Sequence, residues 1–103
     1  MLTATTISSL LTEAIDNRQI VTFRYNGHYR GVEPFTLGRM HNGTLQLSGF
    51  QITGSSESGG IPDWRLFNIQ KIADLEIHEE TFVGNRRGYN PRDSRMSRII
   101  ATV

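Results

Sequence analysis

The pattern of apolar and polar residues changes its period once along the chain, near residue 20. Before that point, one set of apolar residues recurs at the three- and four-residue spacing of a helix face. The residues in this set are Ile7, Leu10, Leu11, Ala14 and Ile15. The spacing predicts an amphipathic helix, capped at Thr5, Thr6 or Ser8 and ending at Asn17, whose apolar stripe lies across another element.

After residue 20, apolar and polar residues alternate, which is the period of a half-buried β-strand. The alternation predicts five strands, over residues 20–25, 29–40, 44–53, 64–69 and 74–78. Asn26-Gly27 and Asn42-Gly43 are expected to be hairpin turns, because both residue types tolerate positive φ. Pro34, inside the second strand, limits that strand to one ladder partner or marks a β-bulge. A tight turn at residues 70–72 accounts for a change of phase before the last strand.

Together these elements predict a mainly β domain in which an N-terminal helix precedes a five-stranded antiparallel barrel of the SH3-like or Sm-like type. Closure is expected because it removes the exposed edges of an open sheet. The 103 residues have room for a single core. We assign residues 1–83 to the helix and barrel and residues 84–103 to a C-terminal extension. Within this extension, residues 99–103 have β composition and either add an edge strand or pair with another copy.

Charge is unevenly distributed, although the net charge is only +1. Residues 1–83 hold six basic and nine acidic residues, whereas residues 84–103 hold five arginines and one aspartate. Guanidinium groups bind phosphate and carboxylate through paired hydrogen bonds. Arg86, Arg87 and Arg92 are therefore candidate nucleic-acid contacts. The alternatives for this basic extension are a solvated tail and a self-association surface.

Several classes of site are not expected. The chain has no cysteine, which excludes disulfides and thiolate metal sites. His28, His41 and His78 are too scattered for a metal motif, and we find neither paired carboxylates nor a nucleophile motif. We therefore expect no metal, no cofactor and no enzymatic activity. No stretch approaches the roughly 20 apolar residues of a membrane span, and the first eleven residues have no basic leader, so we expect a cytoplasmic protein.

The order of short motifs between residues 14 and 89 resembles the WYL domain family. The matching residues are Ala14-Ile15, Val21, Phe23, Tyr25, Gly27, Arg30, Val32-Glu33-Pro34, Gly43, Leu47, Gly49-Phe50, Arg65-Leu66-Phe67, Ile69, Lys71-Ile72, Leu75, Phe82, Arg87 and Tyr89. The Trp-Tyr-Leu run that names the family is replaced here by Leu45-Gln46-Leu47. The resemblance implies an Sm-like barrel that senses ligands in bacterial transcription regulators and defence systems, with nucleotides or single-stranded nucleic acid as the suspected ligands.

The resemblance also implies partners for this chain. Members of the family usually join the domain to a helix-turn-helix and a C-terminal extension, and the residues after Phe82 are too few for either. We therefore expect the chain to act with a helix-turn-helix or effector protein on another chain, as a homo-oligomer, or as a simple binding module.

Five residues are candidate ligand contacts: Arg30, Arg39, Gln46, Ser48 and Arg65. The three arginines lie on predicted strands, where arginine is less expected than in loops. By position in the family, Gln46 takes the place of the tyrosine, Ser48 follows on the same face, and Arg65 is the basic residue of the fourth strand. Such a set offers forked donors for a phosphate and hydrogen-bonding groups for a base. The alternatives are solvated arginines on the outside of the barrel and a module that binds another protein or a second copy, without a small ligand.

Overall fold

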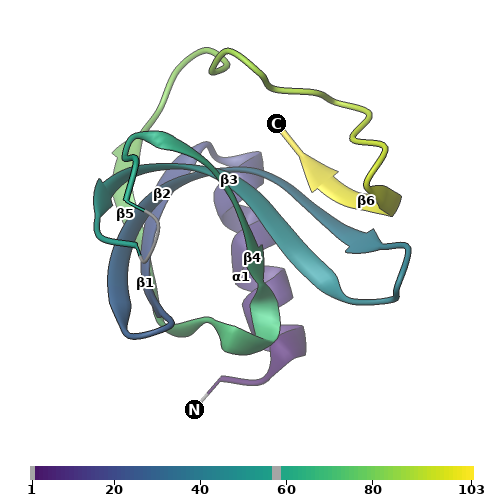
Figure 1. Ribbon diagram of the computed structural model, residues 1–103, viewed down its shortest axis with the longest axis horizontal. Helices are drawn as coiled ribbons and strands as arrows, with labels where there is room; N and C mark the ends of the chain where they lie inside the picture. Colours follow the sequence, from purple (N-terminus) through teal and green to yellow (C-terminus); the bar gives the residue numbers. More distant parts are fainter. Residues whose placement is uncertain (1, 57–58) are drawn as a thin grey trace.

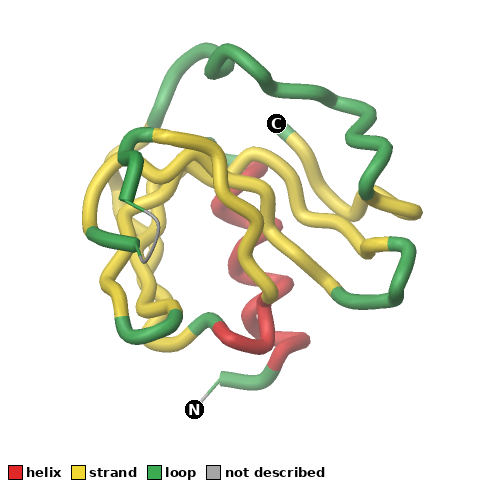
Figure 2. Tube along the Cα trace, viewed as in Figure 1, coloured by secondary structure: helices red, strands yellow, loops and turns green. Residues whose placement is uncertain are grey.

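The computed structural model describes residues 2–56 and 59–103. Its single helix precedes a six-stranded antiparallel sheet, so the predicted mainly β class is confirmed (Figures 1 and 2). The elements are α1 (Ala4–Asp16), β1 (Gln19–Tyr25), β2 (His28–Met40), β3 (Leu45–Gly54), β4 (Asp63–Asn68), the 3₁₀ turn η1 (Ile69–Lys71), β5 (Ala73–Thr81) and β6 (Met96–Thr102).

The helix α1 forms where the apolar stripe predicts it, and it buries Ile7 and Leu11 of that stripe. Its cap differs from the expectation. The side chain of Thr3 accepts a hydrogen bond from the amide of Thr6 at 3.1 Å, so the helix begins at Ala4. The cap predicted further along the chain is therefore wrong, because an earlier hydroxyl already satisfies a free amide of the first turn.

The sheet is open. Its hydrogen-bonded path runs β4-β3-β2-β1-β5, and β6 pairs with the second half of β2. Within the described residues the two end strands, β4 and β5, are not paired, so the predicted closed barrel of five strands is wrong. The turn η1 instead carries the chain from one end strand to the other, and α1 packs its apolar stripe into the core that the curved sheet surrounds. The side chains of α1 therefore cover the part of the core that hydrogen bonds between β4 and β5 would enclose in a closed barrel.

Strand β2 is covered on both of its faces. Residues 30–38 are all buried, whereas a strand with one solvated face would alternate. On the inner face, Val32 and Leu37 join the main core. Phe35 belongs instead to a second cluster on the outer face. The register shifts just after Pro34, which confirms the bulge alternative at this proline and returns Leu37 to the inner face.

The segment between β5 and β6, residues 82–95, covers the outer face of the sheet and is called the strap below (Figure 1). Its Phe82 and Tyr89 pack on Phe35, with ring centroids 5.1 and 5.6 Å away, and Trp64 of β4 lies 5.0 Å from the same ring. After the strap, β6 adds an edge strand beside β2, which is one of the two alternatives expected for residues 99–103. The basic extension is thus part of the folded sheet.

Candidate functional site

The five predicted ligand contacts lie in different places. Successive side chains of a strand point to opposite faces, and the strand register puts Arg30 and Arg65 on the inner face of the sheet. Gln46 and Ser48 lie on the outer face, on either side of the core residue Leu47. Arg39 is exposed near the turn between β2 and β3, where its Nη1 donates to the carbonyl of residue 43 at 2.8 Å.

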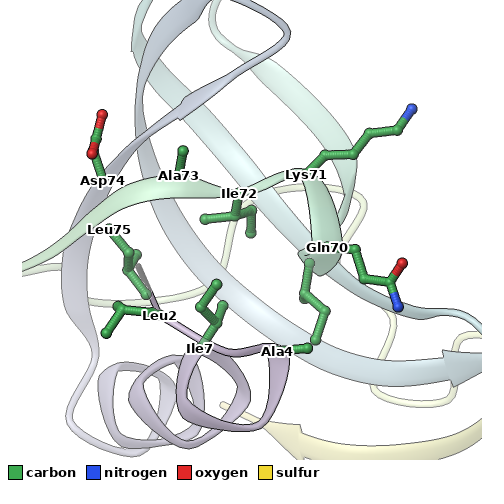
Figure 3. A pocket seen from close by; sticks show the side chains of 10 residues that line it. Leu2, Ala4, Ile7, Gln70, Lys71, Ile72, Ala73, Asp74 and Leu75 are labelled. Carbon is green, nitrogen blue, oxygen red and sulfur yellow. The ribbon is translucent and has the colours of Figure 1, made fainter.

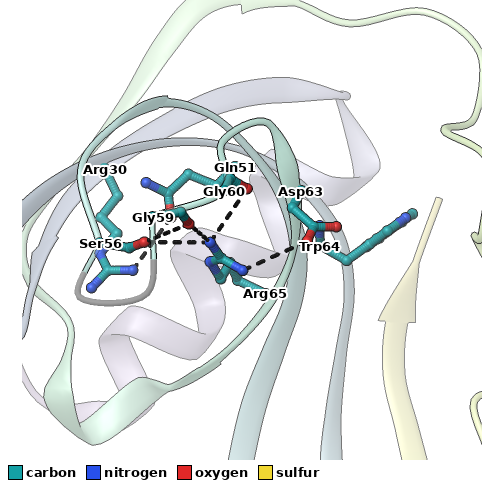
Figure 4. A network of polar contacts seen from close by, with 8 residues as sticks. All are labelled: Arg30, Gln51, Ser56, Gly59, Gly60, Asp63, Trp64 and Arg65. Atoms are coloured by element: carbon teal, nitrogen blue, oxygen red, sulfur yellow. Dashed lines mark hydrogen bonds and ion pairs between the residues drawn. The ribbon is translucent and has the colours of Figure 1, made fainter.

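The inner-face pair, Arg30 and Arg65, lies beneath the loop that joins β3 to β4 (Figure 4). Arg30 donates to Oε1 of Gln51 at 3.3 Å and to the carbonyl of Tyr25 at 3.1 Å, and its guanidinium lies over the Tyr25 ring. Arg65 donates to the hydroxyl of Ser56 at 3.3 Å and to the carbonyls of residues 59 and 60. The bonds of Arg65 hold residues 56, 59 and 60 of this loop against the inner face of the sheet.

On the outer face, a cavity of about 360 Å³ lies between the strap and the sheet, and we call it the strap pocket. Its volume is near the lower end of the roughly 300–1,000 Å³ of small-molecule sites. Its lining is Thr36, Ser48 and Trp64 from the sheet and Gly88, Tyr89, Asn90, Asp93 and Arg95 from the strap. Thr36 and Ser48 are direct neighbours across β2 and β3. Two small side chains therefore form the floor at a place where the strap crosses the sheet.

Beside Thr36, Ser48 is the second buried polar side chain of the strap pocket. It is only 6% exposed, and its hydroxyl has no hydrogen bond to any residue that the structure describes. The neighbouring hydroxyls are paired, because Thr102 contacts Thr36 at 2.8 Å and Tyr89 at 2.7 Å. The oxygen of Ser48 stays accessible from the pocket, so the full cost of an unpaired buried hydroxyl does not apply to it. Ser48 is therefore a hydroxyl of this pocket that a bound molecule can reach and bond.

An ion pair between Asp93 and Arg95 lies at the pocket. Arg95 donates from Nε to Oδ1 at 2.9 Å and from Nη2 to Oδ2 at 2.6 Å. The hydrogen bonds from Arg95 lower the pKa of Asp93, against the opposing effect of partial burial, and the same pairing raises the pKa of Arg95. Both groups therefore stay charged at neutral pH. The pairing also fixes the guanidinium, whose Nη1 has no hydrogen bond to the described residues.

The three predicted nucleic-acid contacts all lie on the strap but differ in their partners. Arg86 donates to both carboxylate oxygens of Glu33, at 2.8 and 2.9 Å, and its guanidinium lies 4.7 Å from the centroid of Phe50. The hydrogen bond to Glu33 raises the pKa of Arg86. The side chains of Arg87 and Arg92 are exposed and form no hydrogen bond or ion pair with the described residues. Arg86 thus anchors the strap, and Arg87 and Arg92 are free to bind an anion.

None of the strap residues that line the pocket is among the ligand contacts predicted from the sequence. Asp93 and Arg95 carry a local signal, because an acid and an arginine two residues apart in a turn can pair. Gly88 carries another, since its φ of +95° favours glycine and its place against the Trp64 indole leaves little room for a side chain. The indole itself donates to the carbonyl of Arg87 at 2.8 Å, which fixes this part of the strap to β4.

A larger cavity of about 650 Å³ lies between the start of α1, the turn η1 and β5 (Figure 3). The apolar side chains of Leu2, Ile7, Ile72 and Leu75 lie together there, while the two charged side chains at its rim extend away from them. This cavity offers apolar contact but no buried polar group that would orient a charged ligand.

The described residues contain no group of three or more His, Cys, Asp or Glu side chains that could hold a metal ion. None of the helices in the described part of the chain is long and apolar enough to cross a membrane. Comparisons with protein-family models, with curated proteins and with solved structures find no match to this chain.

Proposed function

We propose that this chain is a non-catalytic, ligand-sensing module of the WYL type, with an Sm-like arrangement of its strands, that binds a nucleotide or single-stranded nucleic acid. The observation that carries the proposal is the pair of exposed guanidiniums of Arg87 and Arg92, which have no ion-pair partner among the described residues and lie on the strap that walls the pocket over Ser48. Free guanidiniums beside a pocket suit a ligand that has a phosphate at one end and a polar body at the other.

The anchoring of the strap supports this proposal. Binding costs free energy when side chains and loops must be ordered, and a fixed backbone reduces that cost. The strap is held by the ion pair of Arg86 with Glu33 and by the packing of Phe82 and Tyr89. Arg87 directly follows this anchor, so the binding surface needs little ordering of its backbone when a ligand arrives.

The experiment measures binding of a fluorescent oligothymidylate by anisotropy over a range of salt concentrations. The double variant Arg87→Ala/Arg92→Ala should bind more weakly, and its affinity should fall less steeply with salt. The slope of log affinity against log salt concentration should become shallower by about 0.7 for each phosphate contact that is lost. Arg24→Ala is the matched control, because it removes an exposed arginine from the distant pair with Asp74. The proposal is wrong if the native chain shows no binding at low salt, or if the double variant and the control behave alike.

The same proposal places the protein in the cytoplasm and gives it an output through another chain. A helix-turn-helix or effector protein, or a second copy of this chain, would receive the signal. This part rests on the WYL resemblance.

A protein-interaction or oligomerisation module is the second candidate, and the apolar cavity beside α1 favours it. Leu2 is 46% exposed there, next to Ile7 and Ile72. Leu2→Ser should then lower the mass measured by light scattering at high protein concentration, whereas Lys71→Ser at the rim of the same cavity should not. A monomer for the native chain at every concentration rules this candidate out for self-association.

A further inference from the structure

The hydrogen-bonding groups of the strap pocket define the kind of ligand that fits it. Arg95 uses one edge of its guanidinium, Nε and Nη2, on Asp93. The other edge, formed by Nη1 and the second hydrogen of Nη2, remains as a fork of two parallel donors. Asn90 accepts the amide hydrogen of Arg92 with its Oδ1, at 2.9 Å, so its Nδ2 also remains as a donor. The pocket is therefore rich in donors.

The positive charge of Arg95 is neutralised by the carboxylate of Asp93. The carboxylate of Asp93 is bound to Arg95 at 2.6 Å, so the fork of Arg95 belongs to a neutral pair. A second anion would gain less at this fork than at the free guanidiniums of Arg87 and Arg92. A neutral group with two adjacent acceptors matches the fork without adding a charge.

A planar aromatic ligand also suits the walls of this pocket. The rings of Trp64 and Tyr89 line it and are held in place by packing on Phe35, at 5.0 and 5.6 Å between centroids. The hydroxyl of Ser48 can donate or accept, so it can bond a polar edge of a ring that enters the pocket.

We infer that the strap pocket binds a guanine base, whose O6 and N7 accept from the free fork of Arg95 while a polar edge of the ring bonds the hydroxyl of Ser48. Guanine is the base that presents two adjacent acceptors to an arginine fork, whereas adenine presents one acceptor and one donor. This inference rests on the proposed function: the phosphates lie on Arg87 and Arg92 outside, and the base lies in the pocket.

Nucleosides test the pocket alone, because they carry no phosphate. Trp64 is the single tryptophan of the chain and lines the pocket, so its fluorescence reports occupancy directly. Guanosine should bind more tightly than adenosine by about 5- to 150-fold, the range for one good arginine–guanine pair. Inosine keeps O6 and N7 and should bind as guanosine does, whereas 7-deazaguanosine lacks N7 and should bind less tightly. These ligand comparisons require no substitution in the protein.

Variants of the pocket provide the second arm. Arg95→Gln should remove the preference for guanosine, and Ser48→Ala should weaken binding of guanosine while leaving the preference over adenosine. Arg98→Ala is the matched control, because it removes an exposed arginine of β6 that does not line the pocket. Thermal unfolding of Arg95→Gln checks that the variant is folded; if it is not, the 7-deazaguanosine comparison decides.

The outcomes separate the two proposals. If oligothymidylate binds through Arg87 and Arg92 but guanosine and adenosine bind alike or not at all, the guanine inference is overturned and the proposed function stands. If guanosine binds with the expected preference but oligothymidylate does not bind at any salt concentration, the pocket is a nucleoside site and the role of the strap arginines is overturned. If neither ligand binds, both proposals are overturned.

Discussion

Replacing Arg86 by methionine tests whether the strap is held by a buried charge. The substitution keeps an unbranched apolar stem over Phe50 and removes the guanidinium that binds Glu33 at 2.8 and 2.9 Å. The side chain of Glu33 is only 7% exposed, so its carboxylate would stay buried with no cation beside it. The expected result is a marked loss of stability, because the cost comes from the carboxylate that remains.

The size of the effect follows from the burial of the two partners. Removing one partner of a fully buried ion pair costs about 3–5 kcal/mol. The side chain of Arg86 is 46% exposed, so water screens this pair and the figure must be reduced. We expect a loss of about 2–3 kcal/mol from a total of roughly 5–15 kcal/mol. For a domain of this size the melting temperature should fall by about 10–20 °C.

The assay is urea unfolding followed by Trp64 fluorescence, with thermal unfolding as a second probe. Arg87→Met is the matched control, since the neighbouring side chain is exposed and has no partner among the described residues. The two variants should separate two properties: Arg86→Met loses stability, and Arg87→Met keeps stability but binds oligothymidylate more weakly. The double variant Arg86→Met/Glu33→Gln should recover part of the lost stability, because the orphaned charge is gone. Equal stability of Arg86→Met and Arg87→Met would refute the buried-charge argument.

Three further predictions concern the strap and β6. Gly88→Ala should cost about 1–2 kcal/mol from its positive φ and should cost more than Gly84→Ala in urea unfolding, because a Cβ at Gly88 meets the Trp64 indole at 3.0 Å while Gly84 has open space. The pKa of Asp93 is lower in the folded chain than in the unfolded chain. The ion pair of Asp93 therefore contributes stability at pH values above the unfolded pKa of about 3.9, and this contribution is lost as the pH falls through the folded pKa. Melting temperatures measured across this pH range should fall less for Asp93→Asn than for the native chain. Removing residues 96–103 should leave the edge of β2 unpaired and give an unfolded or aggregated chain, observed by circular dichroism and light scattering.

The elements that depend on local sequence could be predicted. The alternation of apolar residues places the strands within a few residues of their observed bounds, and Asn26-Gly27 forms a turn with positive φ at both residues. The turn predicted at residues 70–72 is observed as η1 (Ile69–Lys71). These features follow from the period of side chains along a strand and from backbone freedom at asparagine and glycine, which are local properties.

Closure and the strap could not be predicted in this way, because both depend on contacts between distant residues. Whether β4 pairs with β5 depends on how far the sheet curls and on what fills its opening, and here α1 occupies that place. The ion pair of Glu33 with Arg86 joins residues 53 apart in the chain. Phe35 faces away from Val32 by ordinary alternation, but nothing local in the sequence indicates that the strap covers this face, or that the bulge after Pro34 returns Leu37 to the core.

The placement of the arginines shows why residue type alone did not locate the site. Arg65 and Arg87 look equivalent in the sequence, as arginines within motifs that resemble one family. In the folded chain, Arg65 donates to a hydroxyl and two carbonyls of the loop before β4, whereas among the described residues Arg87 has only its backbone carbonyl engaged, by the indole of Trp64. All three of these bonds use Nη2 of Arg65, and its Nε is buried without a hydrogen-bond partner in the described part of the chain, so a new anion would compete for Nη2 and would have no open access to Nε. The arginines that can bind are therefore those whose backbone is fixed and whose side chains are free. In this chain they lie on the strap.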